Sequence, residues 1–259
     1  MNKYFVNFIL MFIFFGIANV AKAEESLPNI AFPVQKIKIY AKPEFTLNAH
    51  YFKAQKSKGG ALIFHECKNN LSPFLSLAEH LQKLQIDALV LDMRGFGEST
   101  SEVYSHEAIK KKSKDIVTYQ QNSALLNAYW GDDALLVYNY LREKVSSKQP
   151  ISVVSSGCSA FTAVQLAEQV HLKTAVYISP KMDFMAKERY KNLVDIPTYF
   201  FGSAHQTESF QTAKELFNWN GDNRTKVQLA KGTLHSNNFL APNSGLIADI
   251  AEWIARNSH

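Results

Sequence analysis

The sequence lacks most of the short patterns that mark common functional sites. It contains no glycine-rich phosphate-binding loop, no Cys-x-x-Cys pair and no zinc-type spacing, and its eight histidines are scattered. No internal repeat, low-complexity tract or interdomain linker interrupts it. We therefore expect neither a metal nor a cofactor, and we expect one domain.

Charge of one sign is not concentrated either. The formal net charge is +5, and basic residues cluster at one place, Lys110–Lys112 and Lys114. A group this small is more typical of a solvated loop than of a nucleic-acid site. We predict no nucleic-acid partner, and we expect the polar, lysine-rich stretch Ser101–Asn122 to be a loop.

Long apolar runs are limited to the N-terminus, where Lys3 precedes the run Phe8–Ile17 and Ala21–Ala23 follows it. This pattern predicts a secretory signal peptide, residues 1–23, with an A-x-A cleavage site. A membrane anchor is the alternative, but a bilayer span needs about 20 apolar residues. Cleavage removes Lys3 and Lys22 and lowers the net charge from +5 to +3. Residues 24–259 then form one exported domain, periplasmic or secreted, without a stable membrane span.

Hydrophobic periodicity predicts an α/β fold after the signal peptide. Two alternating segments, Val34–Ala41 and Phe45–Ala54, are typical of antiparallel strands joined by a turn. Later strands are short, continuously apolar runs, as expected when both faces are buried, and helices alternate with them. This order predicts a parallel sheet with right-handed crossovers. The later strands are expected at Ala61–Phe64, Ala88–Leu91, Thr174–Ile178, Pro197–Phe201 and Lys226–Ala230, and helices at Trp130–Lys144, Glu208–Trp219 and Leu246–Arg256, besides one opened by Ser72 and Pro73.

The most informative segment is Ile151–Ala160, a buried strand that enters a tight turn of small residues and then the helix Phe161–Val170. Strand, small-residue turn and helix predict a nucleophile elbow. In such an elbow, small flanking residues let the backbone hold the nucleophile in a strained, exposed position. No serine in the segment has small residues at both required flanks.

The register of this elbow has two open solutions. Cys158 has small residues at both flanks, Ser156 and Ala160, and a thiolate is a competent nucleophile when its pKa is lowered. Ser159 fits less well, because a phenylalanine takes the place of one small flank. A different register aligns the helix better and puts Gly157 at the nucleophile position, which would make the site inactive.

Three segments together resemble the α/β-hydrolase fold family, in particular its compact, lidless members similar to dienelactone hydrolase. Leu62–Glu66 resembles the strand and loop that carry the oxyanion hole, and Asp92–Ser99 matches the family's D-x-R-G-x-G-x-S turn. Asp183 and His235 lie where acid-bearing and histidine-bearing loops occur. The resemblance implies a three-layer α/β/α sandwich around a mostly parallel, twisted sheet of eight strands, with antiparallel strands at the N-terminus.

In an active form of such a site, Cys158 attacks an ester or thioester carbonyl, His235 is the base and Asp183 orients the imidazole. The oxyanion would meet the backbone N–H of Ser159 and one from Glu66–Cys67. Plainer alternatives are a surface histidine, a turn or cap role for the aspartate, and a solvated loop carboxylate for the glutamate, which could also contact the cysteine.

Departures from the family pattern favour a second class of function. The acid usually follows the strand before the last, yet Phe201–Glu208 offers no aspartate. The protein is then either a hydrolase of small esters or thioesters with a cysteine nucleophile, or an inactive relative that binds a small ligand or a protein partner. The short stretch Asp183–Pro197 leaves no room for a large lid, so we expect an open pocket suited to a small acyl substrate or ligand.

The two cysteines add a last expectation. The fold implied by the resemblance brings Cys67, on the oxyanion loop, towards Cys158 at the elbow. In the oxidising compartment of an exported protein they could form a disulfide, unless their Cα atoms lie well beyond about 7 Å apart. Such a bridge would block the thiolate and make the site either redox-gated or structural.

Overall fold

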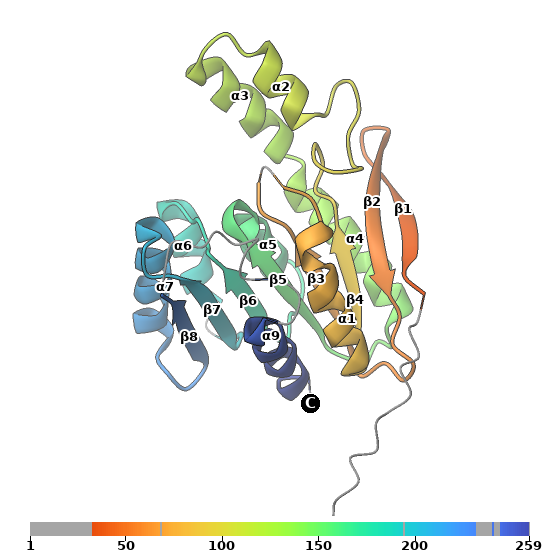
Figure 1. Cartoon of the computed structure of the whole chain (residues 1–259), viewed down its shortest axis with the longest axis vertical. Helices are drawn as coiled ribbons and strands as arrows, with labels where there is room; N and C mark the ends of the chain where they lie inside the picture. The colour runs from red at the N-terminus through yellow and green to blue at the C-terminus, as the bar shows by residue number, and fades with distance from the viewer. Residues whose placement is uncertain (1–32, 68, 194, 232–239, 241–243, 259) are drawn as a thin grey trace, which may run out of the picture. The chain divides into compact units, whose positions relative to one another are not determined.

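A sheet of eight strands organises the part of the chain that the computed structural model describes, namely residues 33–67, 69–193, 195–231, 240 and 244–258. Its strand order is β1-β2-β4-β3-β5-β6-β7-β8. β2 is antiparallel to both of its neighbours, and all other pairs are parallel (Figure 1). The predicted sheet is therefore confirmed. The strands are β1 (Gln35–Ala41), β2 (Phe45–Phe52), β3 (Gly59–Phe64), β4 (Ile86–Leu91), β5 (Ile151–Ser156), β6 (Ala175–Ile178), β7 (Thr198–Ser203) and β8 (Thr225–Ala230).

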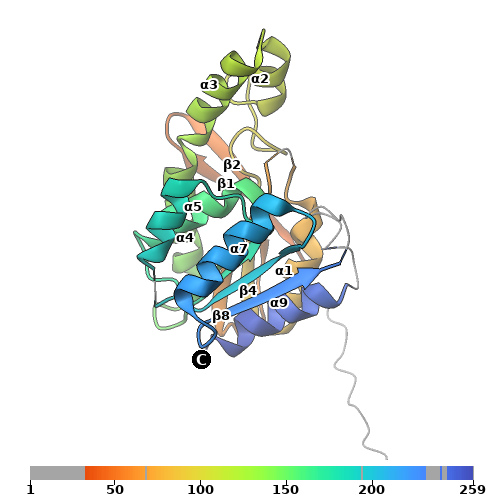
Figure 2. The ribbon, with the colours of Figure 1, turned by 90° about the vertical axis from the view of Figure 1, so that its left-hand side faces the viewer.

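Helices cover both faces of this sheet and complete the predicted three layers (Figure 1, Figure 2). One face carries α1 and α9, which pack against each other over one hydrophobic core. The other face carries α4 to α7, which share a second core. The helices are η1 (Ser72–Phe74, a 3-10 turn leading into α1), α1 (Leu75–Lys83), α4 (Trp130–Lys144), α5 (Ala160–Ala167), α6 (Phe184–Lys191), α7 (Thr207–Asn220) and α9 (Gly245–Arg256).

The central strands are continuously apolar because each of them contributes to both cores. In β3, Leu62 and Phe64 belong to the core beneath α4 to α7, whereas Ala61 and Ile63 belong to the core beneath α1 and α9. All four side chains are fully buried. This two-sided burial holds β4, β3 and β5 in parallel register, so that their carboxyl ends meet at one edge of the sheet.

The expectation of a loop at Ser101–Asn122 is wrong, because two helices occupy most of it: α2 (His106–Lys112) and α3 (Ile116–Asn127). Each helix begins at a side-chain cap. The Ser105 hydroxyl accepts a backbone N–H of α2 at 3.2 Å, and the Asp115 carboxylate accepts one of α3 at 2.7 Å. Such caps satisfy backbone groups that a helix leaves without partners. In both views the two helices extend beyond the sheet (Figure 1, Figure 2).

Two predictions concern segments outside the described residues. The signal peptide, residues 1–23, stays a prediction, and so does the role of His235 as a base. Among the helices that the structure does describe, none combines the length and the apolar character needed to cross a membrane.

Candidate functional site

The elbow after β5 has a glycine at its strained position. Gly157 has φ +56°, in the left-handed region that residues with a side chain rarely adopt, and it begins a 3-10 turn, η2 (Gly157–Ser159), that leads into α5 at Ala160. A Cβ on Gly157 would lie 2.7 Å from Cγ of Glu66. The elbow backbone therefore follows the register that puts glycine at its sharpest point, with Cys158 one residue further along.

Ser159 ties the elbow to the sheet. Its hydroxyl oxygen accepts the backbone N–H of Ser156 at 3.0 Å. The hydroxyl hydrogen lies within reach of two carbonyl oxygens, those of Ser156 at 2.9 Å and Phe64 at 3.2 Å. Because the side chain is fully buried, these bonds stabilise the turn against the end of β3.

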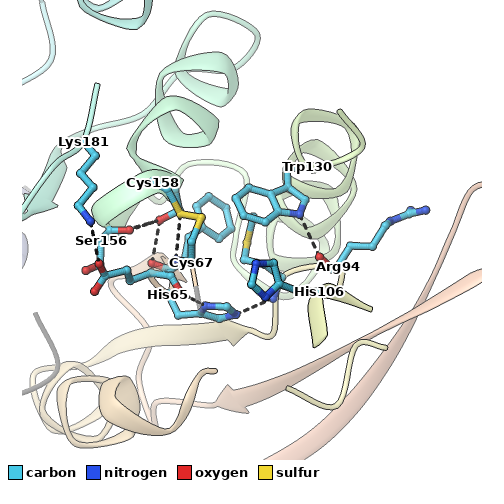
Figure 3. The surroundings of a disulfide bond; sticks show 12 residues. His65, Cys67, Arg94, His106, Trp130, Ser156, Cys158 and Lys181 are labelled. Atoms are coloured by element: carbon cyan, nitrogen blue, oxygen red, sulfur yellow. Dashed lines mark hydrogen bonds and ion pairs between the residues drawn. A yellow bond between two sulfur atoms is a disulfide. The ribbon is translucent and has the colours of Figure 1, made fainter. Parts of the chain in front are cut away.

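A disulfide joins the two cysteines across the end of β3, as the resemblance implied. Cys67 and Cys158 have Cα atoms 5.8 Å apart, and the bridge links the loop after β3 to the first turn of the elbow helix (Figure 3). The backbone N–H of Cys67 donates to Sγ of Cys158 at 2.9 Å. While the bridge is intact, Cys158 has no thiolate, and this N–H of the oxyanion loop is directed at sulfur.

Glu66 lies against the elbow, together with the loop that follows β6. Oε1 of Glu66 is 3.5 Å from Nζ of Lys181, and the backbone N–H of Lys181 donates to the carbonyl oxygen of Gly157 at 3.0 Å (Figure 3). The glutamate is therefore paired with a cation and packed on the glycine. The two loops together cover the position above Gly157 where a larger residue would need space.

His65 is a buried link that the sequence reading did not single out as a site residue. Its Nδ1 contacts the carbonyl oxygen of Glu66 at 2.7 Å, and its Nε2 contacts the backbone N–H of Met93 at 2.9 Å. The carbonyl requires a donor and the N–H an acceptor, which assigns a neutral ring protonated at Nδ1. Burial lowers the pKa of His65 below its ordinary value of 6.5, in agreement with this assignment.

Asp183 lies in an exposed position and caps α6. Its Oδ1 accepts the backbone N–H of Ala186 at 2.8 Å, and its own backbone is extended. This is the plainer of the two roles weighed for it from the sequence. Orientation of a catalytic imidazole by Asp183 stays a prediction, because His235 lies outside the described residues.

The turn after β4 has the hydrogen bonds that its motif requires. Both carboxylate oxygens of Asp92 accept backbone N–H groups at 2.8 Å, one from Leu71 and the other from Glu98. The hydroxyl of Ser99 accepts the backbone N–H of Asn48, also at 2.8 Å. Gly97 has φ +53°, and a Cβ there would collide with the Asp92 carboxylate. The motif residues therefore shape the turn rather than present reactive groups.

Arg94, in the same turn, is fully buried. Its Nε and Nη2 donate to the two carboxylate oxygens of Asp133 at 2.9 and 2.7 Å. Rings of Phe45, Tyr104 and Tyr129 flank the guanidinium, with centroids 4.6, 5.0 and 4.4 Å from Cζ. Burial raises the pKa of Asp133, and the adjacent guanidinium acts in the opposite direction. The bidentate pair anchors α4 to the turn.

A cavity of about 870 Å³ lies between this turn and the helices α2 and α3. Phe96 stacks on His106 with 4.8 Å between ring centroids, and Nε2 of His106 is hydrogen-bonded to the hydroxyl of Tyr119 at 2.7 Å. The lining also includes Asn70, which follows the loop after β3, and Lys110 on α2. Gly157 and Cys158 of the elbow do not line the cavity. The sequence reading missed this cavity because it expected a loop in place of its two helices.

Within the described part of the chain, no three His, Cys, Asp or Glu side chains are grouped so that they could hold a metal ion. The candidate site consists of the elbow, the disulfide and the neighbouring cavity.

Comparisons with known proteins find similarity in structure alone. No family of related sequences and no curated protein matches the chain. A predicted CIB-like hydrolase from Thermoplasma acidophilum superposes with a TM-score of 0.63 at 12% identity, over 86% of this chain and 99% of that one. The Pyrococcus furiosus esterase Pf2001 gives 0.61 at 13%, over 88% and 94%. A soluble variant of monoglyceride lipase from Saccharomyces cerevisiae gives 0.65 at 10%, over 89% and 98%. At identities this low, the structural similarity establishes a shared fold alone.

Proposed function

Since this chain has the fold of the α/β hydrolases, we propose that it is a non-hydrolytic domain of that fold, one that binds a small molecule beside a disulfide-closed elbow. The observation that carries the proposal is Gly157 at the strained turn with φ +56°. In an active hydrolase this position presents the side chain that attacks the carbonyl. A glycine has no atom that could do so.

The oxyanion hole gives independent support. In this fold it consists of the N–H after the nucleophile and an N–H from the loop after β3. With Gly157 at the nucleophile position, these groups belong to Cys158 and to the segment Glu66–Cys67. The N–H of Cys67 is already bonded to Sγ of Cys158, so a carbonyl oxygen would compete with sulfur for it.

The ligand we propose is a small molecule with an apolar ring or acyl part and polar groups. The cavity offers it the Phe96–His106 stack and the hydroxyl of Tyr119, with Asn70 and Lys110 around them. Pockets of about 300–1,000 Å³ with this mixture of aromatic and polar groups are typical of small-molecule sites. Export of the domain, as its N-terminus predicts, is part of the proposal.

A cysteine hydrolase that works only after reduction is the rival function. It is favoured by the position of Cys158 in the first turn of a helix, where the N–H of Cys67 would stabilise a thiolate. In that case Cys158 would attack an acyl carbon and His235 would accept its proton. The two functions differ in whether a free Cys158 produces turnover.

Hydrolysis of p-nitrophenyl acetate separates them. The assay compares three samples. They are oxidised wild type, wild type that has been reduced with dithiothreitol and then separated from the reductant, and the variant Cys67→Ala, which frees Cys158 without any reductant. We expect no turnover above the rate of the matched double variant Cys67→Ala/Cys158→Ala. Multiple turnovers in Cys67→Ala that disappear in the double variant would overturn the proposal in favour of the cysteine hydrolase.

Binding in the cavity is tested with 8-anilinonaphthalene-1-sulfonate, a probe that combines aromatic rings with an anionic group. We expect saturable fluorescence enhancement that weakens in Lys110→Ala and remains in Lys148→Ala, an exposed lysine outside the cavity. Equal binding by both variants would show that the probe binds elsewhere.

A further inference from the structure

The connection between α2 and α3 combines positive charge with exposed apolar side chains. We call residues Lys110–Val117 the hairpin tip. Its four lysines, at positions 110, 111, 112 and 114, are all exposed. Directly after them, Ile116 is 64% exposed and Val117 is 56% exposed. These two neighbouring side chains leave apolar surface in water beside the lysines.

The local charge is not neutralised by the tip itself. Its one carboxylate, Asp115, accepts the backbone N–H of Thr118 at 2.7 Å. These hydrogen bonds lower the pKa of Asp115, so it remains ionised, and four lysines against one aspartate leave a formal charge of +3 on the tip. Glu107, the nearest acid on α2, lies one helical turn before Lys110 and Lys111 and brings the formal charge of this end of the hairpin to +2.

We propose that the hairpin tip docks this domain onto a membrane surface that contains anionic lipid. Ile116 and Val117 would enter the boundary between headgroups and acyl chains, and the lysines would lie among the phosphates. This is the distribution of residues by which peripheral proteins bind the interface, because apolar burial and attraction to anionic headgroups add. Long lysine side chains can extend towards phosphate while their methylene groups stay in the apolar layer.

The geometry favours a lipid surface over a protein or nucleic-acid partner. In both views α2 and α3 extend beyond the sheet, so their tip can reach a flat surface without collision of the other helices with it (Figure 1, Figure 2). The apolar residues are two neighbours at a protruding end rather than a stripe along a helix, which suits shallow insertion. A nucleic acid would make little use of the two aliphatic side chains.

Vesicle co-sedimentation tests the proposal with the exported protein, whose N-terminus is first established by mass spectrometry. Vesicles of phosphatidylcholine with 30% phosphatidylglycerol are compared with vesicles of phosphatidylcholine alone. We expect binding to the anionic vesicles that falls steeply as salt is raised. Since one lysine near such a surface strengthens binding by roughly fivefold, Lys111→Gln/Lys112→Gln should weaken it by about 25-fold.

Matched controls separate the tip from general charge and stickiness. Lys56→Gln/Lys58→Gln removes the same charge from exposed residues before β3, at the opposite edge of the sheet, and should leave binding within about twofold of wild type. Ile116→Ser/Val117→Ser should reduce binding, whereas Phe184→Ser/Met185→Ser, which changes two side chains that are 69% and 61% exposed, should not. Circular dichroism checks that all four variants are folded.

Three results would overturn the proposal. They are absence of binding to the anionic vesicles, equal losses in tip and control variants, and retention of binding after loss of the tip lysines. As a direct readout, tryptophan fluorescence of Ile116→Trp should shift to the blue when anionic vesicles are added. An unchanged spectrum together with capture of an acidic protein through the tip would assign the surface to a protein partner instead. Ile116 also lines the cavity, whereas Lys111, Lys112 and Val117 do not. The lysine variants therefore test the tip without changing the lining of the cavity.

Discussion

Two turns flank the end of β3, one after β4 and one after β5, and different forces hold them in place. In the turn after β4, backbone groups bond to Asp92 and Ser99, and the buried Arg94 is paired with Asp133. In the turn after β5, a covalent bridge through Cys158 and a glycine at positive φ define the shape. The first turn serves the scaffold, and the second is where this fold carries its chemistry. The comparison shows that the hydrogen bonds of the first turn are present in a molecule whose second turn has a glycine at its sharpest point.

The largest effect should come from breaking the buried ion pair of the turn after β4. Arg94→Ala leaves the buried carboxyl group of Asp133 without its bidentate donor, which costs about 3–5 kcal/mol of the free energy of unfolding. Urea denaturation measures the loss. Arg94→Lys keeps the charge but not the planar fork, so its stability should lie between those of wild type and Arg94→Ala. A loss below about 1 kcal/mol in Arg94→Ala would mean that the turn does not depend on this pair.

Removal of the disulfide is expected to have the next largest effect. The bridge closes a loop across a sequence separation of 91 residues, and loss of such a constraint costs about 2–4 kcal/mol. The double variant Cys67→Ala/Cys158→Ala should therefore unfold at lower urea concentration than oxidised wild type. Reduced wild type should match the double variant to within about 1 kcal/mol. If reduction leaves the unfolding midpoint unchanged, the second turn is held by its hydrogen bonds alone.

A side chain at the elbow should have a smaller cost. Gly157→Ala has to adopt φ +56° and displace Glu66, and strain of this kind costs about 1–3 kcal/mol. The variant Glu66→Ala and the double variant separate the two causes in a double-mutant cycle. If crowding contributes, Gly157→Ala will be less harmful in the Glu66→Ala background. Identical costs in both backgrounds would leave backbone strain as the whole effect.

The smallest effect concerns His65, which connects the loop after β3 to the turn after β4. Burial lowers the pKa of His65 in the folded state. Below pH 6.5 the imidazole of His65 therefore binds a proton in the unfolded chain more readily than in the folded chain. The stability that the neutral ring provides is therefore full above pH 6.5 and decreases as the pH falls. The slope for one proton cannot exceed about 1.4 kcal/mol per pH unit. Unfolding curves at pH 7.5 and 5.5 should show a larger acid loss for wild type than for His65→Asn; parallel losses would contradict this role.

The strands and most helices, in their order along the chain, could be predicted because buried positions are apolar and their spacing differs between strands and helices. A run such as Ala61–Phe64 has to be apolar throughout when it faces two cores. The helices α2 and α3 could not be found in the same way. In α3 the apolar residues Ile116, Val117 and Leu125 are exposed, so its apolar positions do not mark a buried face, and the starts of both helices depend on the caps Ser105 and Asp115. Caps of this kind are single residues, and they have little weight against a lysine-rich background.

The sequence predicted which residues come together at the candidate site better than it predicted the role of each residue. The fold implied by the resemblance brought Cys67 and Cys158 together, and the structure contains that bridge. Small flanking residues alone could not choose the elbow register, because the choice depends on which residue has positive φ. Glycine adopts positive φ readily, but small side chains such as serine and cysteine do not by themselves show which residue has it. The cap role of Asp183 was likewise one of two roles compatible with a strand-end carboxylate.

The disulfide also determines what a protease could do to this protein. The hairpin tip, rich in exposed lysines, lies between Cys67 and Cys158 in the sequence, and exposed turns of this kind are preferred sites of cleavage. A trypsin cut there would divide the chain, yet both pieces would remain one covalent molecule through the bridge. The nicked protein would run as a single band on a non-reducing gel and as two bands after reduction. A bond beside the elbow thus makes the far end of the molecule tolerant of a break.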